Sequence, residues 1–272
     1  MCGRYAASRH PDDLVEEFEV VVRPEESLEP DYNVAPTKKV YAVMDRRPRG
    51  AGTTAAGSTG QATDEAPAQA APGAGDGVRR ELAVVTWGLV PSWAKEPSIG
   101  NRMINARMET VAEKPAYKRA FASRRCLLPA DGYFEWYPTQ QTGASGKPLK
   151  QPFFVHPQDG GLLAMAGLYE IWRDPARADD DPERFRWTCT VLTTQAEDSV
   201  GHIHDRMPLM VERDRWGQWL DPSVSGRDDL LSLLVPAAPG RLEAFPVSTD
   251  VNNVRNNGPA LVEPIPADEA LA

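Results

Sequence analysis

The residue with the most distinctive chemistry in this sequence is the cysteine at position 2, directly after the initiator methionine. A small residue here normally lets an aminopeptidase remove Met1, which would leave Cys2 with a free α-amine beside its thiol. An α-amine has a pKa of about 7.7 to 8.0, so near neutral pH a useful fraction can attack a carbonyl and form a Schiff base. The thiol, with a usual pKa of about 8.5, can then add to the imine and close a thiazolidine ring. Cys2 therefore favours chemistry with aldehydes, although a cysteine at position 2, taken alone, is usually incidental.

Two later segments contain groups that could move protons. Glu135 lies in the strongly apolar run 131–136, where burial would raise the pKa of its carboxyl toward a range useful for proton transfer; an outward-facing carboxylate is an equal alternative. Residues 202–208 place two of the four histidines beside Arg206. His204 could transfer a proton there, and Arg206 could hold a phosphate.

The pair His202 and His204 also raises a metal site, completed by Glu135 or Cys2. No second histidine pair, Cys-x-x-Cys motif or His-Glu-x-x-His motif accompanies it, so we expect no metal and no other cofactor. The sequence also has no phosphate-cradling glycine loop and no Gly-x-Ser-x-Gly elbow, which disfavours nucleotide hydrolysis and serine esterase chemistry.

Two segments between these groups have residue types that hold nucleic acids. Residues 87–93 place two tryptophans on either side of a Gly and Pro turn, where aromatic rings can stack on unpaired bases, although core packing is their more common role. Asn105 and Arg107 are two residues apart, so in an extended strand they point to one side. The arginine could fork onto phosphate oxygens and the asparagine could hydrogen-bond a reacting group; a turn with a surface salt bridge is the alternative.

Length and composition indicate one soluble globular protein. The chain has 272 residues, 41% of them hydrophobic, which is enough for a sizeable core. No stretch approaches the ~18 consecutive apolar residues of a membrane span, and the first segment lacks the apolar run of a secretory signal. The three cysteines are an odd number without metal-like spacing, which suits a reducing compartment. We therefore expect a cytoplasmic protein.

The distribution of charge is more informative than its sum. A net charge of −9 argues against a general nucleic-acid coat, because affinity for phosphates needs a basic surface. Between residues 101 and 125, however, only two acidic residues accompany a run of basic ones: Arg102, Arg107, Lys114, Lys118, Arg119, Arg124 and Arg125. This strip could hold a phosphate backbone, and a solvated helix face is at least as well supported by charge alone.

The pattern along the chain predicts a β-rich α+β single domain over residues 1–272, mainly an antiparallel sheet or an open barrel with peripheral helices. Residues 46–80 are rich in Gly, Ala, Pro and Thr, and we expect them to be a disordered insertion between two strands that pair, 39–44 and 81–87. Further strand-like runs lie at 126–129, 132–137, 152–156, 162–172 and 187–194. Polar loops are expected at 139–150 and 173–184, and helical patterns at 12–20, 107–113, 116–123, 213–220 and 228–234.

Taken together, several of these segments resemble the SRAP family, the "SOS response-associated peptidase" proteins, whose members sense abasic sites in DNA. The matching segments follow one another along nearly the whole chain: 1–5, 32–37, 87–93, 104–110, 126–129, 132–136, 193–194, 204–208 and 251–255. The start Met-Cys-Gly-Arg combined with the others is highly specific. The family fold is a β-rich α+β single domain, in agreement with the pattern above.

The resemblance implies that Cys2 forms a thiazolidine with the ring-opened sugar aldehyde of an abasic site, which protects the lesion during the DNA damage response. By the same resemblance, Asn105 orients the amine or the sugar, while Glu135 and His204 move protons. The residues implied to bind DNA or line the site are Arg4, Asn33, Trp87, Arg107, Trp136 and Arg206. The implied partner is single-stranded DNA containing abasic sites, bound by a monomer that joins the nucleoid and not a membrane. Protein partners at replication stay unassigned.

Two alternatives stay open. The first is a thiol peptidase in which His204 and Glu135 serve Cys2, including self-removal of Met1 and, in a related form, lyase-like activity. It would need a peptide groove and an oxyanion hole, for which no motif is present. The second is a noncovalent reader of modified or single-stranded DNA, which uses the tryptophans and arginines alone.

Overall fold

The computed structural model describes residues 2–47, 77–143, 145–266 and 268–271. Most of the insertion expected at 46–80 therefore lies outside the described residues. Its edges are strand: Arg46 ends β3 (Lys39–Arg46), and Arg79 begins β4 (Arg79–Trp87). These two strands pair antiparallel from Lys39 with Thr86 to Arg46 with Arg79, as expected of the flanks.

Five strands close into a barrel. They are β3, β4, β6 (Arg125–Ala130), β9 (Leu163–Arg173) and β10 (Phe185–Gln195). The ring closes because β10 pairs antiparallel with β9 along one edge and parallel with β4 along the other. Two short strands extend β10 beyond the ring: β5 (Asn105–Arg107), which is parallel to it, and β11 (Arg206–Pro208), which is antiparallel.

A second, fully antiparallel sheet packs against the barrel and brings the N-terminus beside it. Its order is β12 (Leu242–Pro246), β8 (Pro148–Pro157), β7 (Gly132–Thr142), β1 (Tyr5–Ala7) and β2 (Asp31–Val34). β7 and β8 form a long hairpin, so the ends of the polar loop expected at 139–150 are strand. Gly132 is required here, because a Cβ at this position would lie 2.5 Å from the Val155 oxygen.

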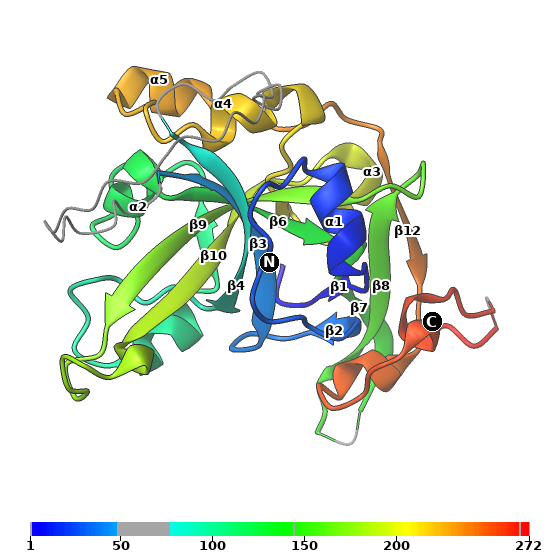
Figure 1. Ribbon diagram of the computed structural model, residues 1–272. Helices are drawn as coiled ribbons and strands as arrows, with labels where there is room; N and C mark the ends of the chain where they lie inside the picture. The colour runs from blue at the N-terminus through cyan, green and yellow to red at the C-terminus, as the bar shows by residue number, and fades with distance from the viewer. Residues whose placement is uncertain (1, 48–76, 144, 267, 272) are drawn as a thin grey trace, which may run out of the picture.

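Short helices surround the sheets. They are α1 (Pro11–Glu17), α2 (Lys118–Ser123), α3 (Asp198–Gly201), α4 (Trp216–Leu220) and α5 (Arg227–Ser232), with 3-10 turns at η1 (Pro97–Arg102), η2 (Pro182–Arg184), η3 (Arg213–Arg215), η4 (Thr249–Asn252) and η5 (Pro259–Val262). The helices α4 and α5 lie at the end of the barrel drawn at the top of Figure 1, and the C-terminal segment lies beside β8 and β12. The β-rich α+β fold is confirmed, and its barrel is closed.

The helix expected at 107–113 is wrong. Arg107 ends β5, and the next main-chain N–H, of Met108, donates to the Thr193 carbonyl on β10 at 3.0 Å. Residues 108–113 form turns instead. Pairing with β10 therefore overrides the local helical pattern, as tertiary contacts often do for a short segment.

The alternation along β7 decides what faces the interior. Tyr133 packs in a cluster between the barrel and the second sheet that also contains Cys2, Tyr5 and Trp87. Its neighbour Phe134 points to the opposite cluster, which packs under the C-terminal segment. Since side chains two residues apart share a face of a strand, Glu135 lies on the same face as Tyr133, toward Cys2.

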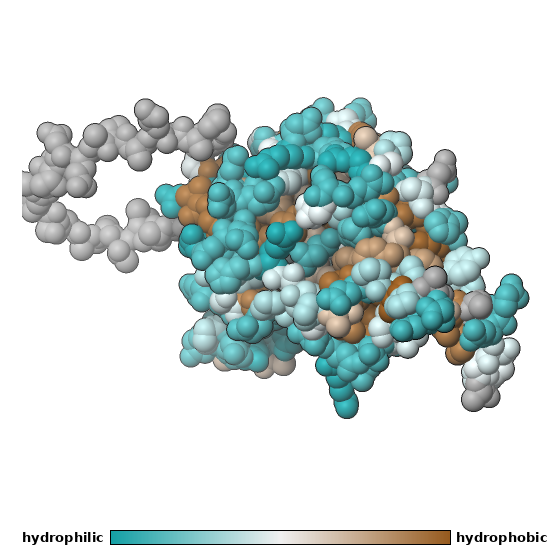
Figure 2. All heavy atoms as spheres, turned by 90° about the vertical axis from the view of Figure 1, so that its right-hand side faces the viewer, coloured by the Kyte–Doolittle hydropathy of each residue, from teal (hydrophilic) through white to brown (hydrophobic). Residues whose placement is uncertain are grey.

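Figure 2 shows the face that carries the second sheet's outer edge as mainly hydrophilic, with hydrophobic residues gathered in its middle. Within the described ranges, no helix is long and apolar enough to cross a membrane.

Candidate active site

Cys2 is completely buried at the N-terminal end of the chain. Its Sγ lies 3.9 Å from the main-chain oxygen of Arg4, two residues on. Burial raises the pKa of the Cys2 thiol well above its usual range, and the nearby charge of Glu135 raises it further. The thiol is therefore protonated near neutral pH, and a thiolate at this position is strongly disfavoured.

Asn105 holds the main chain of Cys2. The parallel pairing of β5 with β10 sets Asn105 opposite Val191 and brings it to the N-terminus. Asn105 Nδ2 donates to the Cys2 carbonyl at 2.6 Å, and the Tyr117 hydroxyl donates to the main-chain oxygen of Asn105 at 3.2 Å. Asn105 Oδ1 is buried and accepts no hydrogen bond among the described residues, so an acceptor is available beside the anchored backbone.

Glu135 is a buried carboxyl with only 4% of its surface exposed. Burial raises the pKa of this carboxyl, and the nearby charge of His204 opposes part of the rise. This decides between the two alternatives left by the sequence, because Glu135 points inward and not into solvent. A carboxyl of raised pKa that retains a charged neighbour is suited to accept and return a proton.

His204 lies on the turn before β11, with a third of its side chain exposed. Its Nδ1 accepts from the main-chain N–H of Arg206 at 3.0 Å and lies 2.9 Å from Asp205 Oδ1. The chain therefore holds the His204 ring through Nδ1 at the edge of the pocket that it lines.

Glu135 and His204 line one open pocket of about 410 Å³. The other lining residues are Arg4, Trp136, Lys150 and Asn252. The Arg4 guanidinium lies 5.7 Å from the centre of the Trp136 ring, whose Nε1 donates to Asn252 Oδ1 at 2.6 Å. The structure thus brings an acid–base pair, two cations and an aromatic ring to one opening, next to the buried Cys2.

Two residues expected to bind DNA are buried. Asn33 is 0% exposed, and its amide holds Arg4 and the backbone near the C-terminus, so it shapes the pocket from behind. Trp87 is also 0% exposed; its ring lies 5.0 Å from that of Tyr5, and its Nε1 donates to the Ile104 carbonyl at 2.9 Å. In this structure neither side chain is exposed to a DNA strand, because Asn33 bonds to Arg4 and the main chain and Trp87 packs in the core; their roles toward DNA stay predictions.

The arginines of the expected DNA interface differ in availability. Arg107 is exposed at the end of β5. The side chain of Arg206 is only 15% exposed and binds Glu109 through two hydrogen bonds of 2.5 and 3.0 Å, so a phosphate must compete with this carboxylate. In the basic strip, Arg125 is buried and donates to main-chain carbonyls around α2 and α4, while Arg124 pairs with Glu170 at 2.8 Å. The strip is therefore shorter than the sequence suggests.

Sequence reasoning missed three residues that the structure brings forward. Trp93 is 60% exposed, whereas Trp87 was the tryptophan of segment 87–93 predicted to bind DNA or line the site. Asn252 and Lys150 line the pocket from the C-terminal segment and from β8. Asn252 lies within a segment that matched the family, which was the available signal; Lys150 had none.

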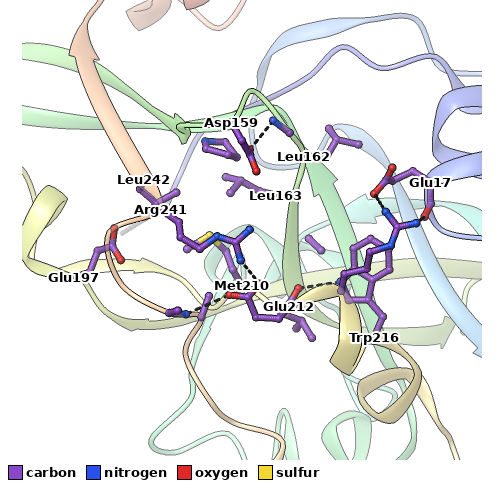
Figure 3. Close-up of a pocket in the computed structure, with 17 residues that line it drawn as sticks. Glu17, Asp159, Leu162, Leu163, Glu197, Met210, Glu212, Trp216, Arg241 and Leu242 are labelled. Carbon is purple, nitrogen blue, oxygen red and sulfur yellow. Dashed lines mark hydrogen bonds and ion pairs between the residues drawn. The ribbon is translucent and has the colours of Figure 1, made fainter.

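A second pocket, of about 280 Å³, lies between α1, the β8–β9 turn and the start of β12 (Figure 3). None of the candidate residues lines it. Two of its carboxylates, Glu17 and Glu212, face the guanidinium groups of Arg213 and Arg241. These charged side chains therefore pair with one another within the second pocket, whereas the candidate residues Glu135 and His204 line the open pocket. Across the part of the chain that the structure describes, no group of three His, Cys, Asp or Glu side chains could hold a metal ion.

Comparison of the sequence with known families gives one clear match. The model of the family described as "SOS response associated peptidase (SRAP)" matches residues 1–254. The abasic site processing protein YoqW of Bacillus subtilis is 34% identical over 264 residues, covering 97% of this chain and 99% of the relative. The abasic site processing protein YedK of Escherichia coli is 29% identical over 272 residues, covering 97% and 100%.

Two further comparisons are with a relative that the chain covers in part and with a solved structure. The abasic site processing protein HMCES of Xenopus tropicalis is 34% identical over 206 residues, covering 68% of this chain and 57% of the relative. A crystal structure of a protein from Bacteroides thetaiotaomicron superposes with a TM-score of 0.71 at 22% identity, covering 97% of this chain and 100% of that chain. At this identity the superposition shows the shared fold alone.

Proposed function

Because this chain belongs to the SOS response associated peptidase (SRAP) family, we propose that it senses abasic sites in single-stranded DNA and captures them covalently through Cys2. The names of its relatives, abasic site processing proteins, support the substrate. The observation that carries the proposal is the grip on Cys2: Asn105 anchors its carbonyl, and its neutral thiol lies buried beside Glu135.

The state of the thiol sets the order of the reaction. After removal of Met1, the α-amine of Cys2 attacks the sugar aldehyde and gives a carbinolamine, which loses water to form an imine. The Cys2 sulfur then bonds to the imine carbon while its proton passes to the nitrogen, which closes the thiazolidine. One water is released in total. The amine reacts first because the buried thiol has a raised pKa and is therefore a poor nucleophile. Once the imine has formed, its carbon lies next to the sulfur, and the thiol can lose its proton as the C–S bond forms.

The acid–base pair supplies the protons. Glu135, with its raised pKa, accepts a proton from the attacking amine and returns it to the departing water. His204, which lines the opening beside Glu135, donates to the ring-opened sugar or its phosphate. The free Oδ1 of Asn105 accepts an N–H of the amine and so fixes the direction of its lone pair.

The DNA strand passes over the open side of the pocket. Arg107 and Trp93 are exposed and supply a phosphate contact and a stacking ring, while Arg4 and Trp136 line the opening itself. A protein of net charge −9 with so local a basic surface binds undamaged DNA weakly. Covalent capture then supplies the residence time, and the protein, cytoplasmic when free, stays with the nucleoid while linked to DNA.

A thiol peptidase is the second candidate, in keeping with the family name. The same burial that favours capture opposes it, since a peptidase of this kind needs a thiolate at Cys2. Self-removal of Met1 requires only one turnover and is compatible with the site. Sustained cleavage of peptides would need the thiolate that burial of Cys2 disfavours.

Two variants separate amine from thiol chemistry. Cys2→Ala retains an N-terminal amine, so it should form an imine that borohydride traps, and no stable adduct without reduction. A chain with glycine inserted between Met1 and Cys2 retains the thiol but lacks the 1,2-aminothiol, so it should give no thiazolidine. Stable capture by the inserted chain would contradict the proposal and favour chemistry of the thiol alone.

A further inference from the structure

A loop of residues 251–257 forms one side of the open pocket. It begins at the end of η4, and its Asn252 lines the pocket together with Glu135 and His204. Neither of the acid–base residues lies near this loop in sequence. The loop is therefore a separate structural part of the site.

Asn33 on β2 fastens the loop from its buried side. The Asn33 Nδ2 lies 3.3, 3.0 and 2.9 Å from the main-chain oxygens of Val251, Asn253 and Asn256. Asn33 Oδ1 accepts from Arg4 Nη1 at 2.7 Å, and the same Nη1 donates to the Val251 oxygen at 2.8 Å. One buried amide thus joins the loop to the cation that lines the pocket.

A second fastening lies at the far end of the loop. Asn257 Oδ1 accepts from the main-chain N–H of Tyr32 at 2.8 Å, and its Nδ2 donates to the Pro30 oxygen at 3.0 Å. With the bond from Trp136 to Asn252, the loop is held at its start, middle and end. A loop ordered in this way loses little conformational entropy when it binds a ligand.

The outer side of this fastened loop presents an apolar and a cationic side chain in sequence. Val254 is 47% exposed, and Arg255 is exposed with no ion pair to any residue in the described part of the chain. Val254 and Arg255 follow Asn252 by two and three residues, and the pocket that Asn252 lines also contains Arg4 and Lys150, so this part of the loop combines an apolar side chain with positive charge, as a contact for a nucleic-acid strand does.

We propose that residues 252–255 are a second, preformed contact for the DNA strand: Val254 packs on the face of a base next to the lesion, and Arg255 binds a backbone phosphate. This inference rests on the proposed function and adds to it a recognition element for the flanking nucleotides. Asn33 then acts as a positioning residue, because its hydrogen bonds fix the position of the loop relative to Arg4.

The test compares substrates with and without flanking nucleotides. Val254→Ser, Arg255→Ala and their combination are measured beside Arg227→Ala, a matched control on α5, whose side chain is 63% exposed. One substrate is a single-stranded oligonucleotide with a central abasic site, and the other is 2-deoxyribose 5-phosphate, which offers the aldehyde alone. At subsaturating oligonucleotide the double variant should capture about 10-fold more slowly, with an unchanged maximal rate. Arg255→Ala alone should reduce the slope of log rate against log salt by about 1.

The sugar phosphate distinguishes the outcomes. Equal rates of all variants with 2-deoxyribose 5-phosphate, together with slower capture of the oligonucleotide, support the proposal. Capture of the oligonucleotide at the wild-type rate by the double variant would overturn it, as would an equal loss on both substrates. If the wild-type protein reacts with neither the sugar phosphate nor the oligonucleotide, the proposed function itself is wrong, and the proposal for the loop is wrong with it.

Discussion

The contact between Asn105 and Cys2 gives the most direct prediction about the chemistry. Asn105→Ala removes the only side-chain donor given to the Cys2 carbonyl within the described residues, a bond of 2.6 Å to a completely buried residue. Removing one partner of a buried hydrogen bond costs about 1 to 3 kcal/mol. If this contact holds the amine in its reacting position, the cost falls on the barrier, and capture should slow by about 5- to 150-fold.

The assay is single-turnover crosslinking to an abasic oligonucleotide at saturating DNA, read on a denaturing gel. Tyr117→Phe is the matched control, because it removes the hydroxyl that donates to the Asn105 main chain and leaves the Asn105 side chain in place. We expect the control to stay within about 3-fold of wild type. An Asn105→Ala protein that is folded and captures DNA as fast as wild type would refute the role given to this asparagine.

Four further substitutions separate folding from function. Glu135→Gln removes a carboxyl whose pKa is raised by burial, so the folded protein holds this proton to higher pH than the unfolded chain does. The variant should match wild type below about pH 4.3, gain stability relative to wild type from there up to the raised pKa, and keep that gain at higher pH, which urea unfolding across pH measures. It should also lose capture in the crosslinking assay. A variant that is less stable than wild type at neutral pH would contradict the burial argument. Asn33→Ala breaks the bond from Arg4 and those to three carbonyls, and should lower the free energy of unfolding by about 3 kcal/mol in urea; a change below 1 kcal/mol, the value of about one ordinary hydrogen bond, would mean that the loop is not held by it. Trp93→Ala should weaken binding to single-stranded DNA, measured by fluorescence anisotropy, by about 1 to 3 kcal/mol and leave the free energy of unfolding unchanged. Trp87→Ala should lower the free energy of unfolding by about 3 to 5 kcal/mol. The reverse pattern would show that Trp87 is the stacking residue.

Much of the fold could be predicted because strand patterns are local. The seven strand-like runs correspond to β3, β4, β6, β7, β8, β9 and β10. Closure of the barrel could not be predicted, since it depends on a parallel contact between β4 and β10, which are about 100 residues apart in sequence. β5 was missed for a related reason: three residues are too few for a periodic pattern, and their strand exists only because β10 lies beside them.

For the candidate site as well, the residue types could be predicted from the sequence, but their burial could not. Residue types and the family resemblance nominated Cys2, Asn105, Glu135 and His204, and the structure places them as an anchored thiol, its anchor and two pocket residues. Burial, by contrast, is a property of the packed molecule. Trp87 ends a barrel strand and packs inward, while Trp93 lies beyond the Gly88 turn and is exposed. Arg125 shows the same limit for charge, because a basic residue in a sequence can serve buried carbonyls as well as phosphates.

Intact mass spectrometry can detect the proposed covalent bond between the N-terminal Cys2 and an abasic sugar. The protein is incubated with a single-stranded oligonucleotide carrying one abasic site, beside Cys2→Ala and an undamaged oligonucleotide. We expect a heat-stable species with the mass of the protein lacking Met1 plus the oligonucleotide minus one water, absent from both controls. A folded protein that lacks Met1 and forms no such adduct would contradict it.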